Sequence, residues 1–332
     1  MHEFLTDWLV CPACHDDLVW RIEERAGAHI ESGQALCQAC EEAYPIRDGI
    51  GVFLLPDLPR DDLWQDVDSA LVKYLRDKPD VDERLMGVPL ESLAPADQFF
   101  RAMAAEERGD FDEATRAETL ANQRLYTAEC RACSDSQGAY VIEQLAGYDG
   151  PVVDLASGRG HLVERMIGDS DRLVVATDFS LKVLQRNRRW LKHLRQYEKV
   201  SLLAFDARRT PMRTGIVPLL TTYLGLPNVE QPGELLAELR RIVAGAFLAV
   251  SHFYPTDDQA NGQALRQAGL DALLFKQSAL DRFAESGWLA EVANACAGPA
   301  RRTPTGVVIE GAVIDGFPVA ETQLEWCVIE AH

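Results

Sequence analysis

Four cysteines near the start of the chain have the spacing of a metal site. Cys11 and Cys14 form one C-x2-C pair, and Cys37 and Cys40 form a second pair after 22 intervening residues. Two such pairs can place four thiolates tetrahedrally around one zinc ion. Because four thiolates leave no open position for water or substrate, we expect a structural zinc site rather than a catalytic one.

Three acids further along the chain each close a short apolar run that is typical of a buried strand. They are Asp154, Asp178 and Asp206, which end the runs at residues 152–155, 173–178 and 200–206. The carboxyl ends of parallel strands meet at one edge of a sheet, where α/β proteins bind nucleotide-like ligands. A carboxylate there can accept hydrogen bonds from ribose hydroxyls or from an adenine amino group. The sequence therefore predicts a ligand site at this edge.

A glycine-rich turn, Ala156-Ser157-Gly158-Arg159-Gly160, joins the first of these strands to a helix that begins at His161. Such a turn lets the backbone approach a ligand closely. The dinucleotide fingerprint needs a third glycine, and this chain has His161 or Val163 at that position. The turn therefore indicates a nucleotide-like cofactor other than NAD.

The turn and the three acids together resemble the first three motifs of class I, Rossmann-like, S-adenosylmethionine-dependent methyltransferases. The run 154–160 is similar to the DLASGxG variant of the ubiquinone-type enzymes, although Ala156 replaces the more usual glycine. The resemblance covers about residues 148–331, but the acid usual at the start of the fourth strand is absent from residues 216–218.

This resemblance implies how S-adenosylmethionine binds. Asp154 would face the methionine amino group, Asp178 would hold the ribose, and Asp206 would meet the adenine edge. The cofactor-binding residues that it implies are Asp154, Ala156, Ser157, Gly158, Gly160, Asp178, Phe179, Asp206 and Ala207.

The second pair of cysteines is followed by the run Tyr44-Pro45-Ile46-Arg47-Asp48-Gly49-Ile50-Gly51-Val52-Phe53-Leu54. This run resembles the end of the zinc ribbon in the family typified by the small activating partner of tRNA and release-factor methyltransferases. The resemblance covers residues 8–56, and Gly51 stands where that family usually has proline.

Together these features predict an α/β fold. We expect a Rossmann-like methyltransferase sheet with helices on both faces and a C-terminal antiparallel strand pair, preceded by a small zinc ribbon and a helical segment. The expected domains are a zinc ribbon at 1–58, a helical linker or lid at 59–147 and a cofactor-binding methyltransferase domain at 148–332. Apolar alternation predicts a ribbon hairpin at 18–22 and 28–30. The methyltransferase resemblance implies a fourth strand with its exit loop at 218–226, a fifth strand at 245–251, and a closing pair at 307–314 and 324–330.

The middle segment has apolar spacing near three and four, which predicts helices broken at Pro79, Pro89 and Pro95. These helices could form a lid over the pocket or a plain connecting bundle. Cys130 and Cys133 repeat the C-x2-C spacing on an expected helix. They could be a redox pair or two incidental cysteines.

The net charge of −19 is unevenly spread, with −18 in residues 1–150 and −1 in residues 151–332. This acidity argues against nucleic acid as a partner, because phosphate binding needs lysine and arginine. A basic helix is expected after the second strand, with Lys182, Arg186, Arg188, Arg189, Lys192 and Arg195 around Trp190. We expect it to contact the acidic front half through exposed groups, in contacts that weaken with salt.

The leading functional hypothesis is a methyltransferase that acts on a small molecule or a protein. An rRNA or tRNA methyltransferase is an alternative, but residues 1–60 carry 11 acids against 4 lysines and arginines. A non-catalytic module that binds the cofactor or a partner is a second alternative, since no known acceptor motif follows the fourth strand. The methyl acceptor stays unidentified.

Candidate side chains near the acceptor are Tyr223 and His252, with Asn228 and Tyr254 beside them at strand ends. A general base is needed only if the acceptor must lose a proton. No run of 18 apolar residues and no secretion signal is visible, so we expect no membrane span and a cytoplasmic location.

Overall fold

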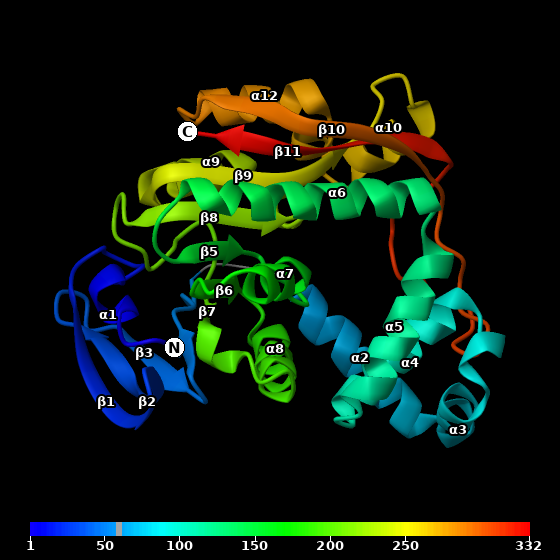
Figure 1. Cartoon of the computed structure of the whole chain (residues 1–332), viewed down its shortest axis with the longest axis horizontal. Helices are drawn as coiled ribbons and strands as arrows, with labels where there is room; N and C mark the ends of the chain where they lie inside the picture. Colours follow the sequence, from blue (N-terminus) through cyan, green and yellow to red (C-terminus); the bar gives the residue numbers. More distant parts are fainter. Residues whose placement is uncertain (58–61) are drawn as a thin grey trace.

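The computed structural model describes residues 1–57 and 62–332, whose strands join into one mixed sheet (Figure 1). Within these residues the sheet has 11 strands, in the order β1-β2-β3-β4-β7-β6-β5-β8-β9-β11-β10. The strands are β1 (Leu18–Ala26), β2 (His29–Cys37), β3 (Ala43–Arg47), β4 (Ile50–Val52), β5 (Val152–Leu155), β6 (Val174–Asp178), β7 (Val200–Ala204), β8 (Val217–Tyr223), β9 (Val243–Phe253), β10 (Ala290–Ala300) and β11 (Thr322–Ala331).

The centre of the sheet is parallel. Strands β7, β6, β5, β8 and β9 pair in parallel in that order, and β11 pairs antiparallel with both β9 and β10. Every residue of β5, β6 and β7 is buried, as expected of parallel strands covered on both faces. The predicted Rossmann-like sheet with a C-terminal antiparallel pair is confirmed.

Helices cover both faces of this sheet. Those in the described residues are α1 (Leu5–Trp8), α2 (Leu63–Asp77), α3 (Pro79–Gly87), α4 (Pro95–Glu107), α5 (Phe111–Leu125), α6 (Ala128–Gln144), α7 (His161–Asp169), α8 (Leu181–His193), α9 (Pro232–Ile242), α10 (Gln259–Gln267), α11 (Asp271–Leu274) and α12 (Lys276–Glu285). Short 3-10 turns lie at Leu90–Ser92, Leu145–Gly147, Tyr197–Lys199 and Leu226–Asn228. Apolar residues of α6, α7 and α8 pack on one face of the sheet, and those of α9 and α12 pack on the other.

Helices α2 to α5 have an apolar cluster of their own, to which Ile309 also belongs. Pro79 and Pro95 stand at the first positions of α3 and α4, where proline costs no hydrogen bond. The helix breaks predicted at these prolines are confirmed. Within the described residues, no helix has both the length and the apolar character needed to cross a membrane.

The ribbon strands extend the methyltransferase sheet. The predicted hairpin is confirmed as β1 and β2, and β4 pairs in parallel with β7, so that Ile50 lies opposite Leu202. The N–H of Phe53 continues this ladder by donating to the carbonyl of Ala204 at 2.7 Å. The ribbon therefore covers an edge of β7 that would otherwise expose unpaired backbone groups.

One member of the predicted closing strand pair lies elsewhere. The partner of β11 is β10, whereas residues 307–314 form turns and irregular chain. Three N–H groups of this segment donate to the buried carboxylate of Asp97 in α4, from Val307, Val308 and Ile309 at 2.8, 2.9 and 3.0 Å. The strand prediction at 307–314 was wrong because a carboxylate satisfies these donors and Ile309 packs on the helices instead of the sheet.

The predicted basic helix is α8, and its cations do face the acidic front half. The ion pairs are Arg186–Glu106, Arg188–Glu31 and Arg189–Glu107. The expectation that these groups are exposed is wrong for the first pair, in which the Arg186 and Glu106 side chains are 6% and 5% exposed. Salt screens a buried pair much less than an exposed one, so we now expect this contact to persist as salt rises.

Gly51 of β4 offers a test of how the ribbon packs. A β-carbon there would lie 2.8 Å from Leu203 Cδ2 and 2.9 Å from Phe53 Cε2. We expect Gly51→Ala to lower the free energy of unfolding by about 1–3 kcal/mol, because the added methyl must displace packed side chains. Chemical denaturation measures this change. Gly87→Ala is the control, since no atom lies within 4 Å of its added β-carbon. Equal stability of the two variants would contradict the packing described here.

Candidate metal and cofactor sites

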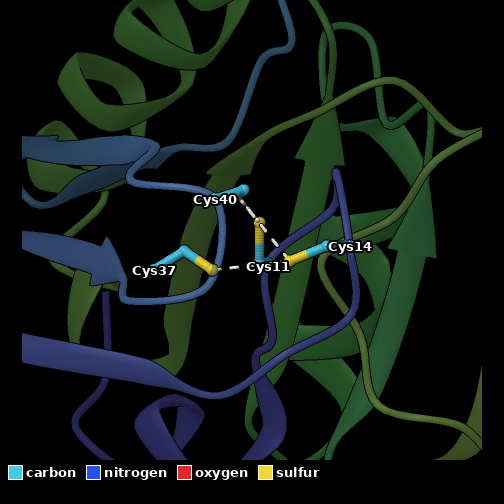
Figure 2. Close-up of side chains that lie close together, drawn as sticks. All are labelled: Cys11, Cys14, Cys37 and Cys40. Carbon is cyan, nitrogen blue, oxygen red and sulfur yellow. Dashed lines mark hydrogen bonds between the residues drawn. The ribbon is translucent and has the colours of Figure 1, made fainter.

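The four N-terminal cysteines converge on one point from two separate turns (Figure 2). Their Sγ atoms all lie within 4.8 Å of one another. The Cys11–Cys40, Cys14–Cys37 and Cys14–Cys40 separations are 3.5, 3.4 and 3.7 Å. Zinc–sulfur bonds of about 2.3 Å in a tetrahedron place the sulfurs about 3.8 Å apart. The cluster therefore fits one zinc ion with four thiolate ligands.

Tyr44 lies beside this cluster. Its hydroxyl is 3.1 Å from Cys11 Sγ, and both residues are buried. Burial and the neighbouring thiol raise the pKa of Tyr44 well above its usual range, so the hydroxyl keeps its proton. A protonated hydroxyl can donate to a metal-bound thiolate, which orients the ligand. This contact gives a physical reason for the tyrosine at the start of the Tyr-Pro-Ile run.

The glycine-rich turn after β5 has an unusual backbone. The φ angles are 49° at Ala156, 50° at Gly158 and 86° at Gly160, a left-handed conformation that costs glycine little and alanine more. The N–H of Ser157 donates to the carbonyl of Thr177 in β6 at 2.8 Å. This bond ties the turn to the neighbouring strand, at the edge where α/β sheets bind ligands.

Asp154 lies in β5, two residues before the turn begins at Ala156. The Thr221 hydroxyl of β8 donates to its Oδ1 at 2.8 Å. Burial raises the pKa of Asp154 to about 7, so both protonation states are populated near neutral pH. A cationic ligand group beside it would favour the carboxylate.

Asp178 ends β6 and binds the turn itself. Its Oδ2 accepts from the N–H of Gly158 at 3.0 Å, and its Oδ1 accepts from the N–H of Ser180 at 2.9 Å. Burial raises the pKa of Asp178 to about 6, and these backbone donors oppose the rise. A carboxylate has about four acceptor positions, so these bonds leave capacity for a ligand hydroxyl. Phe179, the next residue, is half-buried.

Asp206 follows β7 and is already engaged by a neighbouring side chain. Arg208 donates to it from Nε at 3.0 Å and from Nη2 at 2.7 Å, and its backbone N–H adds a third bond at 2.9 Å. The Asp206 and Arg208 side chains are 7% and 5% exposed. Bidentate pairs of this kind are strong and directional. The edge predicted to meet adenine, with Ala207 between these residues, therefore carries an ion pair rather than a lone carboxylate.

A group of charged residues around the turn was missed from the sequence. Arg159, between the two turn glycines, donates to Glu106 of α4 at 2.8 Å and to Glu118 of α5 at 3.1 Å. Glu118 also lies 3.8 Å from His161 Nε2, measured from its Oε1. The partners of Arg159 are 53 and 41 residues away in the chain. No local spacing links them, so no pattern in the sequence marked this group.

Tyr223 and Asn228, two of the candidates near the acceptor, lie at the end of β8 and just beyond it. The hydroxyl of Tyr223 hydrogen-bonds the Ser134 hydroxyl of α6. Asn228 donates to the carbonyl of Leu224 at 3.4 Å. Tyr223 thus joins β8 to α6, and the Asn228 bond is local.

His252 and Tyr254 lie at the end of β9. The His252 ring is 5.7 Å from the Tyr254 ring and 5.1 Å from the Trp326 ring, centroid to centroid. Its buried Nδ1 has no hydrogen-bond partner among the described residues. Burial lowers the pKa of His252 to about 4, so the ring is neutral near pH 7. The half-buried His252 thus packs against two aromatic rings.

Cys130 and Cys133 lie on α6, as predicted, and both face β10. Cys130 Sγ donates to the carbonyl of Pro299 at 3.1 Å, and Cys133 hydrogen-bonds Cys296. Burial raises the pKa of Cys133 to about 12. A thiol with so high a pKa is a poor redox nucleophile, which favours incidental packing over a redox pair.

Comparison with known proteins gives one family match and one curated relative. Residues 2–49 match the family model described as Trm112p-like protein. A stretch of 107 residues is 34% identical to the demethylmenaquinone methyltransferase of Renibacterium salmoninarum, and the match covers 32% of this chain and 42% of that enzyme. The chain thus spans about two fifths of the length of this curated relative.

Solved structures resemble the chain more distantly. A SAM-dependent methyltransferase from Aquifex aeolicus is 11% identical, with a TM-score of 0.40, over 58% of this chain and 88% of that one. A geranyl diphosphate methyltransferase in complex with SAM is 15% identical, with a TM-score of 0.45, over 67% and 90%. Since both scores are below 0.5, the fold assignment depends on the strand order of the chain itself. The chain joins a Trm112p-like zinc ribbon to a class I methyltransferase fold.

Proposed function

We propose that this chain is an S-adenosylmethionine-dependent methyltransferase with a small-molecule or protein acceptor. The main support is the position of Asp154, Asp178 and Asp206 at the carboxyl ends of neighbouring parallel strands, around a turn with left-handed glycines. The identity to a demethylmenaquinone methyltransferase supports methyl transfer as the reaction.

The residues of the chain would bind and orient the cofactor, which supplies a methyl group on a positively charged sulfur when bound. Asp154 would hold the methionine amino group, and Asp178 would accept from the ribose hydroxyls. The pair of Asp206 and Arg208 would bound the adenine edge. Because methyl transfer is a displacement between two bound reactants, holding them in line supplies much of the acceleration.

The charge distribution favours a small-molecule or protein acceptor over RNA. The arginines of α8 at positions 186, 188 and 189 are already paired with carboxylates of the front half. An RNA-binding face would need such cations to be available for phosphates. The acidic ribbon adds to this argument, with 11 acids against 4 lysines and arginines in residues 1–60.

We propose a structural role for the ribbon. One zinc held by Cys11, Cys14, Cys37 and Cys40 would fold it, and β4 would then complete the sheet edge at β7. The domain boundaries that we propose are 1–58, 59–147 and 148–332, although α6 in the second segment packs on β10 and β11.

Cofactor binding is the first test. Calorimetric titration should give micromolar binding of S-adenosylmethionine or S-adenosylhomocysteine, about −8 kcal/mol, and no comparable binding of NAD. Asp178→Asn should weaken binding by roughly 1–3 kcal/mol, because one charged acceptor for ribose is lost. Asp171→Asn is the control, since that aspartate is exposed and pairs only with Lys199 in the described structure. NAD binding as tight as that of the methionine cofactor would refute the assignment.

The pH dependence of binding tests the role of Asp154. Its pKa of about 7 means that below pH 7 the free protein holds a proton that a cationic amino group must expel. Binding should therefore weaken as pH falls from 7.5 to 5.5, by roughly tenfold or more, with proton release on binding. Calorimetry in buffers of different ionisation enthalpy measures the protons released. In Asp154→Asn the larger part of this dependence should disappear, leaving a weaker fall near pH 6 from Asp178, and a wild-type affinity that is flat across this range would count against the role.

Zinc content tests the ribbon. Elemental analysis should find one zinc per chain, and the double variant Cys37→Ser, Cys40→Ser should lose it. Loss of the metal should unfold the ribbon, because zinc binding supplies the folding energy of such small domains. Cys296→Ser, outside the cluster, should keep its zinc. Undiminished zinc in the double variant would exclude these cysteines as ligands.

A further inference from the structure

A buried group of charges joins the helical segment to the cofactor turn. Glu106 of α4 accepts from Arg159 Nη2 at 2.8 Å and from Arg186 Nη2 at 2.5 Å, both at its Oε1. Its Oε2 accepts from Arg186 Nε at 3.2 Å. The side chains of Glu106, Arg159 and Arg186 are 5%, 7% and 6% exposed. One carboxylate therefore holds two guanidinium groups away from water.

The contacts of Arg159 and Arg186 fix the turn itself. Arg159 is the residue between Gly158 and Gly160, and its guanidinium also binds Glu118 of α5 at 3.1 Å. Arg186 Nη1 donates to the backbone carbonyl of Arg159 at 2.6 Å. The same charged group thus holds both the side chain and the backbone of the central turn residue.

This arrangement matters because the turn must be held in one conformation. Residues 156, 158 and 160 all have left-handed φ angles, which glycine adopts easily but which strain Ala156 and persist there only where the surroundings over-determine the backbone. Asp178 and Asn187 hold the Gly158 peptide groups, through its N–H and its carbonyl. The ion pairs of the Arg159 side chain come instead from α4 and α5, two helices that precede β5 in the chain.

We propose that Glu106 is a positioning residue for the cofactor, which sets the turn through Arg159 and makes the helical segment part of the binding site. This inference rests on the proposed function, because it concerns the same cofactor turn. It favours the lid interpretation of residues 59–147 over a plain connecting bundle. Because coupling between two sites is reciprocal, cofactor binding should in turn stabilise α4 and α5.

A second buried ion pair in the same helices provides a control that separates an effect on cofactor binding from an effect on protein stability. Arg101 Nη2 of α4 lies 2.5 Å from Glu113 Oε1 of α5, and the two side chains are 11% and 9% exposed. This pair resembles the Glu106 group in burial and charge, and its hydrogen bonds and ion pairs lie within residues 85–116, away from the turn. Glu107 gives an exposed comparison, because it pairs with Arg189 at 3.2 Å with side chains 30% and 41% exposed.

The test measures S-adenosylhomocysteine binding by calorimetry, in the full chain with its zinc. We expect Glu106→Gln to weaken binding at least tenfold, because two buried arginines lose their shared carboxylate and the turn shifts. We expect Glu113→Gln to lower the thermal midpoint while changing affinity less than twofold. Glu107→Gln should leave both quantities unchanged.

Hydrogen exchange gives a second readout. In the wild type, S-adenosylhomocysteine should slow amide exchange in residues 95–125, and in Glu106→Gln this protection should be lost. If Glu106→Gln fails to fold, Arg159→Met keeps the apolar stem and leaves Glu106 paired with Arg186, and it should show the same loss of affinity.

Wild-type affinity in folded Glu106→Gln, or an equal loss in Glu113→Gln, would overturn the positioning role and leave the proposed function standing. A wild-type chain that binds neither S-adenosylmethionine nor its product would overturn both.

Discussion

Parallel strands bring their carboxyl ends to one edge of the sheet. In this chain three buried aspartates lie at that edge, and each needs hydrogen-bond donors to offset the cost of burying its charge. Asp154, Asp178 and Asp206 end neighbouring strands, and each has a different partner. A hydroxyl serves the first, backbone N–H groups the second and an arginine the third. These donors differ in how well they stabilise a buried carboxylate, because a charged donor such as arginine offsets more of the burial cost than a neutral hydroxyl or N–H group does.

Because their hydrogen-bond partners differ, we expect the three acids to have different roles in binding the cofactor. Burial raises the pKa of Asp154, whose carboxylate accepts from the Thr221 hydroxyl, to about 7, and it raises the pKa of Asp178, which is held by backbone N–H groups, to about 6. Asp154 is the group most responsive to an incoming cation. Asp206, held by Arg208 on both oxygens, is the most firmly positioned of the three. A rigid ion pair suits recognition of a planar edge better than attraction of a cation.

The local parts of this site were predictable from the sequence, and the long-range parts were not. The strand, turn and acid pattern around residues 152–178 is read within one stretch of chain, so the apolar runs and the glycines were sufficient. The Arg159–Glu106 contact joins residues 53 apart, and no periodicity carries that information. Only the fold, by packing α4 and α5 against α7 and α8, brings these charges together.

The misassigned strand at 307–314 has a similar cause. Its apolar run resembles a strand, whereas the true strand β10 contains small residues and a register shift between Ala293 and Cys296. The edge position of β10 tolerates this irregularity, because a bulge on an edge strand disturbs only one ladder. What decided the outcome was Asp97, which offers the backbone of residues 307–309 three hydrogen bonds from a helix over 200 residues earlier.

Some of the acidic side chains in residues 1–150 form ion pairs with α8. A segment with a net charge of −18 repels itself, and three of its acids pair with arginines of α8: Glu107 near the surface, Glu31 partly buried and Glu106 buried. The exposed pair of Glu107 and Arg189 adds little to stability. The buried group is different, because Glu106 is shared by two arginines on separate elements, and one of them, Arg159, lies inside the glycine-rich turn. Glu106, one of the acids that make the front half negative, therefore helps to hold the conformation of the turn through Arg159 and Arg186, although it lies 53 residues before Arg159 in the sequence.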